Sequence, residues 1–357
     1  MSATAAVSLA AGIGHGAPKP HKVTGIVCVE ACAGPREAAV GSTVRLTGRR
    51  LGGTMEVRFA GDPGEAPTTP TAVHGHAVEV VVPPGAIGGR PRALDASGAA
   101  STAPRLEIVP PESLPAPGSF ALERGSARPR KAFFDSRREA RLRYRFRGYG
   151  PLDLRLTLVR RGKVFHRWTE QDRAPFARHA VRWNGLTESG GGAPKGRYRF
   201  RVAPPGGPGR SAGRFRFYDH LFPVRGPHGY GDRFGVPRSG GRTHEGQDLW
   251  AGCGTRLEAA RGGNVQARGY SASLYGHYLV IDGRQTDRDY MYSHLVRPPT
   301  AKRGARVRTG ERIGAVGRSG NARGEACQLH FELWPSGWRN GSPRDPVREL
   351  RRWDGWS

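Results

Sequence analysis

The stretch Gln328-Leu329-His330-Phe331-Glu332-Leu333-Trp334 decides the fold of the C-terminal part of this chain. Polar and apolar side chains alternate along it with period two, which is typical of a half-buried β-strand. On such a strand Gln328, His330 and Glu332 share one face, so an imidazole stands between an amide and a carboxylate. Glu332 either faces the site or serves as a paired structural carboxylate.

Two upstream segments add side chains of the same chemical kind. His244-Glu245-Gly246-Gln247-Asp248 carries an imidazole and a carboxylate four residues apart, and Tyr292-Ser293-His294-Leu295 carries a further imidazole. Two histidines and one carboxylate, with a fourth position left for water, form the ligand set of a catalytic zinc. The three segments together therefore indicate a zinc site.

In this order the three segments resemble the motifs H-x-x-x-D, Y-x-H-L and H-x-H-F-E of the lysostaphin-type (LytM-like) zinc endopeptidases. The resemblance covers residues 222–346, and members of that family cut the peptides of peptidoglycan. It implies that His244, Asp248 and His330 bind the zinc ion (Zn2+). It also implies that His294 orients or deprotonates the attacking water.

Gln328 departs from the family pattern, because it stands at the first histidine of H-x-H. An amide cannot accept or relay a proton at a useful pH, but it can donate a hydrogen bond to a developing oxyanion. Loss of one general acid–base group typically costs about 10²–10⁴-fold in rate. We therefore expect a zinc metalloendopeptidase that hydrolyses peptidoglycan peptides with reduced or altered activity, with His294 and Gln328 as its catalytic residues.

Gln328 also supports an alternative, a catalytically inactive zinc-binding pseudo-peptidase that binds cell-wall peptides or regulates another wall hydrolase. A third interpretation is a carrier domain of the biotinyl or lipoyl kind, whose Gly-rich turns resemble residues 307–317. This interpretation is the weakest, because Lys302 is the only lysine nearby and lies outside any exposed-hairpin lysine motif.

Length and composition favour several β-rich domains. The chain has 357 residues, which allows two or three domains that each bury a core. Its 53 glycines and 29 prolines favour strands joined by turns. No apolar run approaches the ~20 residues that span a bilayer, so we expect no transmembrane segment.

The net charge of +27 favours polyanionic partners, among them anionic polymers of the cell wall. No helix-turn-helix, zinc-finger or aromatic RNA-binding signature is present, so no specific nucleic-acid partner is expected. A compositional bias toward arginine explains the charge equally well. The oligomeric state stays open.

The expected fold class is all-β, with two immunoglobulin-like β-sandwich domains before a β-rich LytM-like (duplicated hybrid motif) peptidase domain. Residues 25–109 carry short alternating runs between Gly/Pro turns and resemble the IPT/TIG type of immunoglobulin-like domain. Residues 110–219 resemble the immunoglobulin-like domain of flagellar hook-capping type. The peptidase domain is expected at 220–346, and residues 347–357 form a basic tail without an assigned role.

Arginine alternates with apolar residues in the predicted strands of the second sandwich, as in Ala140–Phe146 and Arg197–Val202. Each such strand has one core face and one cationic face. The cationic face is either a docking surface for an acidic polymer or an ordinary solvated face, and the second explanation is the commoner one.

The four cysteines form two pairs, Cys28 with Cys32 and Cys253 with Cys327, which suits an oxidising compartment. We predict a disulfide in each pair, with free buried thiols as the alternative. Residues 1–24 are a leader or a disordered tail, because Ala5–Ile13 resembles a short signal-peptide core without a basic segment before it. A secreted or cell-wall-associated (extracytoplasmic) protein is therefore expected.

Overall fold

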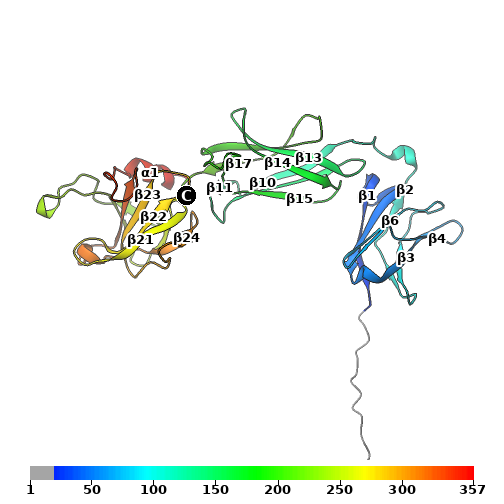
Figure 1. Ribbon diagram of the computed structural model, residues 1–357, viewed down its shortest axis with the longest axis horizontal. Coiled ribbons are helices and arrows are strands. Elements are labelled where there is room, and N and C mark those ends of the chain that lie inside the picture. The colour runs from blue at the N-terminus through cyan, green and yellow to red at the C-terminus, as the bar shows by residue number, and fades with distance from the viewer. Residues whose placement is uncertain (1–19) are drawn as a thin grey trace, which may run out of the picture. The chain divides into compact units, whose positions relative to one another are not determined.

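The computed structural model describes residues 20–357, whose regular elements are almost all β-strands (Figure 1). The predicted all-β class is therefore confirmed. The described chain divides into two compact units. The first holds the residues up to Ala121 with Arg147–Pro151 and Ala174–Phe176, and the second holds Leu122–Phe146, Leu152–Arg173 and Ala177–Ser357. The predicted leader falls mainly on residues 1–19, outside the described residues.

The first unit consists of two sheets around one core. Their strand orders are β1-β2-β6-β5, with β9 paired to β2, and β4-β3-β7-β8. Leu46 and Val80 of one sheet are buried in the same cluster as Val57 and Phe59 of the other. The strands are β1 (Lys22–Gly34), β2 (Glu37–Arg49), β3 (Thr54–Ala60), β4 (Glu65–Thr68), β5 (Ala72–His74), β6 (Ala77–Val81), β7 (Arg92–Asp95), β8 (Ala100–Thr102) and β9 (Glu107–Ile108), with short 3₁₀ turns at Leu51–Gly53 and Pro111–Ser113.

The second unit begins with another pair of sheets, ordered β10-β12-β15 and β11-β17-β16-β13-β14. The Trp183 ring on one sheet lies 4.7 Å from Phe217 and 5.0 Å from Tyr198 on the other, so aromatic packing joins the two sheets. The immunoglobulin-like class of both sandwiches stays a prediction. The strands are β10 (Ala121–Arg128), β11 (Lys131–Phe133), β12 (Ala140–Arg147), β13 (Leu152–Arg160), β14 (Lys163–Arg173), β15 (His179–Trp183), β16 (Gly196–Ala203) and β17 (Arg210–Tyr218).

The rest of the second unit contains a seven-stranded sheet, ordered β18-β19-β26-β23-β22-β21-β24, and a separate β20-β25 pair. These strands are β18 (His228–Tyr230), β19 (Gln247–Ala251), β20 (Arg256–Glu258), β21 (Gly263–Ser271), β22 (Gly276–Gly283), β23 (Asp289–Leu295), β24 (Arg306–Val307), β25 (Arg312–Ala315) and β26 (Gln328–Trp334), with 3₁₀ turns at Ser239–Gly241 and Gly320–Ala322.

The predicted strand Gln328–Trp334 is β26, but it is not half-buried. All seven of its residues are buried. The apolar face packs in the core, where Leu329, Phe331 and Leu333 lie. The polar face is covered because His244 and Asp248 lie against it and contact His330.

The stretch 347–357 forms helix α1 (Val347–Asp354) and the three residues that follow it. The helix packs on the seven-stranded sheet (Figure 1). Leu350 and Trp353 are buried in the same cluster as Phe331. The Trp353 ring stacks on His220 with centroids 4.5 Å apart. Its apolar residues therefore make the tail part of the folded domain.

Within the second unit, Asp135 of the sandwich makes ion pairs with Arg306 at 2.8 Å and Arg284 at 3.2 Å. The Thr309 N–H also donates a 3.0 Å hydrogen bond to the Asp135 carbonyl. Asp135 is buried, so it links the sandwich to the sheet that follows. Among residues 20–357, no helix has the length and apolar character needed to cross a membrane.

Candidate metal centre and active site

Three of the predicted site residues, His244, Asp248 and His330, meet in one buried cluster. Antiparallel pairing of β19 with β26 places Asp248 opposite His330, and His244 lies three residues before β19. His330 Nδ1 is 2.8 Å from His244 Nε2 and 2.9 Å from Asp248 Oδ1, and His244 Nε2 is 3.2 Å from the same Oδ1. The three side chains predicted to bind metal therefore converge on one point.

The remaining ring nitrogens of this cluster are engaged elsewhere. His244 donates its Nδ1–H to the Arg233 carbonyl at 2.8 Å, and His330 donates its Nε2–H to Glu332 Oε1 at 3.0 Å. The electron pairs of His244 Nε2 and His330 Nδ1 then both point toward Asp248 Oδ1. Such a triangle of acceptors requires a cation in its centre, either a proton or a metal ion.

The charges of the cluster fit this geometry. Burial alone would raise the pKa of Asp248, but hydrogen bonds from His244 and His330 hold that pKa well below its usual range. Burial alone would lower the pKa of His330, but hydrogen bonds to Asp248 and Glu332 raise it to about 9. A proton on His330 thus satisfies the acceptors when no metal is bound. Two imidazoles and a carboxylate are a protein ligand set that fits Zn2+.

Glu332 and Arg238 contact two members of the cluster, His330 and Asp248. Glu332 is fully buried, and its Oε2 accepts a 2.7 Å hydrogen bond from Trp334 Nε1. Arg238 Nη2 lies 3.5 Å from Asp248 Oδ2. Glu332 therefore faces the site, where it pairs with His330, as one of the two alternatives from the sequence predicts. Sequence reasoning missed Arg238, whose loop position carries no motif.

His294 lies beside the cluster at the end of β23, with its ring centroid 5.8 Å from that of His330. Its Nδ1–H donates a 2.8 Å hydrogen bond to the Ser319 carbonyl, so Nε2 carries the free electron pair. Burial, followed by the positive charge of His330, lowers the pKa of His294 to about 4. The ring is therefore neutral at neutral pH.

The backbone at His294 is strained. Its φ is 61°, in the left-handed region that residues other than glycine rarely adopt. The His294 N–H donates a 2.8 Å hydrogen bond to the Tyr275 carbonyl, which helps to hold this conformation. Strain of this kind clusters at functional sites.

Gln328 is buried on β26, two residues before His330 and on the same strand face. Its Nε2 donates a 3.3 Å hydrogen bond to Glu325 Oε2, which occupies one of its two N–H groups. Its predicted hydrogen bond to a substrate oxyanion stays a prediction. Sequence reasoning missed Glu325, since no motif marks it.

A disulfide joins Cys253, which follows β19, to Cys327, which precedes β26. The two Cα atoms are 5.3 Å apart, within the range that a disulfide spans. A second disulfide joins Cys28 to Cys32, with Cα atoms 5.7 Å apart. Both predicted disulfides are therefore confirmed, and the first connects the strands that carry Asp248 and His330.

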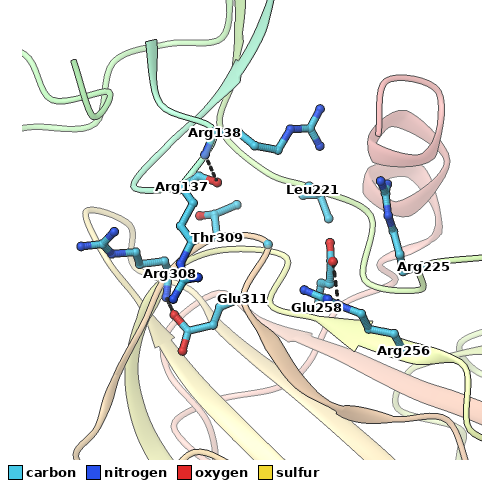
Figure 2. A pocket seen from close by; sticks show the side chains of 11 residues that line it. Arg137, Arg138, Leu221, Arg225, Arg256, Glu258, Arg308, Thr309 and Glu311 are labelled. Carbon is cyan, nitrogen blue, oxygen red and sulfur yellow. Dashed lines mark hydrogen bonds and ion pairs between the residues drawn. The ribbon is translucent and has the colours of Figure 1, made fainter. Parts of the chain in front are cut away.

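A separate cavity of about 240 Å³ lies elsewhere in the second unit (Figure 2). Its carboxylates are already engaged: Glu258 pairs with Arg256 at 2.9 Å, and Glu311 accepts the backbone N–H of Arg308 at 3.1 Å. Its lining contains no histidine and none of the predicted site residues, so we do not assign catalysis to it. The lining consists of Ser136, Arg137, Arg138, Leu221, Arg225, Arg256, Glu258, Arg308, Thr309, Gly310 and Glu311.

Comparison with known proteins identifies the C-terminal domain. Residues 242–346 match the sequence model of peptidase family M23. The catalytic domain of the antimicrobial peptidase lysostaphin from Staphylococcus simulans is 26% identical, with 35% of this chain and 92% of that chain covered and a TM-score of 0.32.

Two further solved structures are similar. A mutant catalytic domain of the prophage-encoded M23 protein EnpA from Enterococcus faecalis is 30% identical, with 35% of this chain and 95% of that chain covered and a TM-score of 0.30. A zinc-containing peptidase from Vibrio cholerae is 16% identical, with 72% of this chain and 77% of that chain covered and a TM-score of 0.31. The resemblance that the three motifs carry is confirmed by the family match.

Proposed function

We propose, from the premise that residues 242–346 are a peptidase family M23 domain, that this chain is a zinc metalloendopeptidase that hydrolyses peptide bonds of peptidoglycan. One observation carries the proposal. His244 Nε2, His330 Nδ1 and Asp248 Oδ1 lie within 3.2 Å of one another, and the neutral His294 lies beside them.

His244, Asp248 and His330 would hold the zinc ion. Bound there, Zn2+ supplies a Lewis acid and lowers the pKa of a water molecule. The chain fixes the orientation of its ligands: the Arg233 carbonyl holds the His244 ring, and Glu332 holds the His330 ring. Such outer partners set the tautomer and raise the basicity of the ligating nitrogen.

His294 would move the proton. Its Nδ1–H is fixed on the Ser319 carbonyl, so only Nε2 is free to accept a proton from the attacking water. The same nitrogen can then give that proton to the leaving amine. Because burial lowers the pKa of His294, its ring is neutral and Nε2 is available to accept a proton.

Gln328 would act only by hydrogen bonding. Its second amide N–H can donate to the carbonyl oxygen of the scissile bond as negative charge develops there. It cannot share proton transfer with His294, so hydrolysis is expected to be slower than with a histidine at this position.

The proposed location is outside the cytoplasm, secreted or associated with the cell wall. Two disulfides in the described residues suit an oxidising compartment. Peptidoglycan peptides are the proposed substrate, and the sandwiches at 25–109 and 110–219 are proposed to act as spacers or wall-binding modules. The start of the peptidase domain near residue 220 belongs to the same proposal, and the stretch 347–357 is counted with this domain because Leu350 and Trp353 are buried in its core.

A second candidate function is a zinc-binding pseudo-peptidase that binds wall peptides or regulates another wall hydrolase. The observation that favours it is the hydrogen bond from Gln328 to Glu325, which ties the amide to a carboxylate in place of a proton-transferring histidine.

Metal analysis combined with a wall-digestion assay tests the proposal. Wild type is expected to bind one zinc per chain and to release peptide fragments, whereas His330→Ala loses zinc and activity. His74→Ala is the matched control, because His74 is exposed in the first unit and is expected to change neither quantity. Wild type that stays metal-free after zinc reconstitution would overturn the proposal. Zinc binding without digestion would favour the pseudo-peptidase.

A further inference from the structure

A cationic groove of about 1370 Å³ lies on the five-stranded sheet of the second unit, and the end of β10 (Gly125–Arg128) also lines it. Its lining holds eleven arginine or lysine side chains and no aspartate or glutamate. The remaining lining residues are mainly small or apolar. The groove is therefore a continuous positively charged surface, separate from the histidine cluster.

Strand alternation builds the centre of this groove. Tyr198 and Phe200 of β16 are buried, while Arg197 and Arg199 point outward, and Arg201 continues the row. Alternate residues on one strand face are about 6.6–6.8 Å apart, so β16 presents evenly spaced guanidinium groups. A linear polymer with a regular charge repeat matches such a row.

The neighbouring strand β17 places two arginines directly opposite two arginines of β16. Arg197 pairs in register with Arg216, and Arg199 with Arg214. Directly opposed side chains have Cβ atoms about 4.5–5.5 Å apart, and like charges at that distance destabilise a sheet. The four arginines of these two pairs make no ion pair with any of residues 20–357. The sheet therefore carries a repulsion that an anionic ligand would relieve.

Three basic residues of the lining do have partners in the fold. Lys131 Nζ donates a 2.9 Å hydrogen bond to the Trp356 carbonyl. Arg167 pairs with Glu188 at 2.6 Å, and Arg201 donates a 2.7 Å hydrogen bond to the Gly209 carbonyl. We place the binding centre on the two opposed pairs for this reason.

We propose that this groove binds a linear phosphodiester polymer with a polyol or sugar backbone, of the kind found in cell walls. The guanidinium fork matches phosphate oxygens in a bidentate manner, and nearly all the cations of the groove are arginine. The choice of a wall polymer rests on the proposed function; the phosphate chemistry rests on the groove itself.

Other polyanions fit the groove less well. Proteins that bind single-stranded nucleic acid stack bases on exposed aromatic rings, but the aromatic residues of this lining, Tyr198 and Phe215, are buried. A lipid surface requires a flat or protruding cationic face, whereas this face is hollowed.

Binding of the full chain to synthetic poly(glycerol phosphate) tests the proposal. Arg199→Gln with Arg214→Gln is expected to weaken binding roughly tenfold or more and to reduce the slope of log affinity against log salt by about 1.5 to 2. The matched control is Arg141→Gln with Arg143→Gln on β12 of the opposite sheet. These residues are also exposed, alternate on one strand and carry the same charge. The control is expected to stay within about twofold of wild type.

The variant itself is expected to fold at least as stably as wild type, because it removes one opposed charge pair. A lower thermal midpoint for this variant than for wild type would contradict the argument from repulsion.

Three other results would overturn the proposal. These are equal loss of binding in variant and control, tighter binding of an oligo(dT) strand or of polygalacturonate than of poly(glycerol phosphate), and binding only to phosphatidylglycerol vesicles. Hydrolysis of a soluble wall peptide is expected to be unchanged by Arg199→Gln with Arg214→Gln. If the wild-type chain binds the polymer but hydrolyses no wall peptide, the proposed function alone is refuted. The two results are independent because binding is measured on isolated polymer.

Discussion

The imidazole of His330 donates its Nε2–H to the carboxylate of Glu332, which is fully buried and two residues along the same strand. This contact decides which nitrogen of His330 faces the metal site. Glu332 also accepts a hydrogen bond from Trp334 Nε1, so both of its oxygens are used. The strand that bears a metal ligand thus also bears the group that orients it.

Glu332→Gln is expected to weaken zinc binding roughly 10–100-fold. The substitution removes the negative charge and leaves one acceptor for two buried N–H donors, from His330 and Trp334. Competition titration with a zinc chelator measures the affinity. Glu311→Gln is the control, since Glu311 accepts only a backbone N–H, from Arg308. An unchanged affinity in Glu332→Gln would show that the carboxylate does not tune the ligand.

Zinc binding is expected to release a proton at pH values below about 9. In the metal-free protein, hydrogen bonds to Asp248 and Glu332 outweigh burial and raise the pKa of His330 to about 9, so zinc must displace the proton on Nδ1. Apparent affinity should therefore increase by up to roughly tenfold per pH unit between pH 7 and 8.5. Calorimetric titration in buffers of different ionisation enthalpy counts the proton; a count near zero at pH 7.5 would refute the argument.

The same pKa sets the pH dependence of stability without metal. A histidine whose pKa is raised by folding stabilises the folded state fully below its unfolded pKa, and this contribution is lost as the pH rises through about 9. Metal-free protein is thus expected to lose stability between pH 7 and 9. The zinc-loaded protein should not show this loss, because its His330 no longer holds the proton. Thermal unfolding of both forms across this range measures the difference.

Gln328→His is expected to raise turnover on wall peptides without changing zinc content. The new imidazole can share proton transfer with His294, and restoring a general acid–base group is typically worth about 10²–10⁴-fold at most. His294→Ala should abolish activity while zinc is retained. Gln328→Asn is a suitable control, because it keeps an amide and gains no base. Should Gln328→His leave turnover unchanged while His294→Ala is harmless, the binding-module interpretation would replace the catalytic one.

Removal of the Cys253–Cys327 disulfide by paired alanine substitution is expected to destabilise the second unit. The bond links residues 74 positions apart, and opening such a loop costs roughly 4 kcal/mol on chain-entropy grounds. All seven tryptophans of the chain lie in the second unit, so tryptophan fluorescence during urea unfolding reports on that unit. Removal of Cys28–Cys32 in the first unit is the control and should leave this transition in place. If removal of either disulfide leaves the urea midpoint of the second unit unchanged, the Cys253–Cys327 disulfide does not stabilise that unit.

The sequence by itself determined the features that depend on near neighbours. Alternation along Gln328–Trp334 identified β26, because successive side chains of a strand point to opposite faces. Motif order and spacing identified the family and brought forward His244, Asp248, His294 and His330 as site residues. The even cysteine count led to both disulfides.

Tertiary structure decided what depends on distant segments. The pairing of β19 with β26 brings together residues 82 positions apart, and backbone carbonyls of Arg233 and Ser319 set the tautomers of His244 and His294. A carbonyl is present in every residue, so no side-chain pattern marks the one that accepts a given hydrogen bond. Burial of both faces of β26 and of Trp353 in the tail likewise followed from packing between elements. Local alternation fixes which way a side chain points, but only the assembled sheet fixes what it meets there.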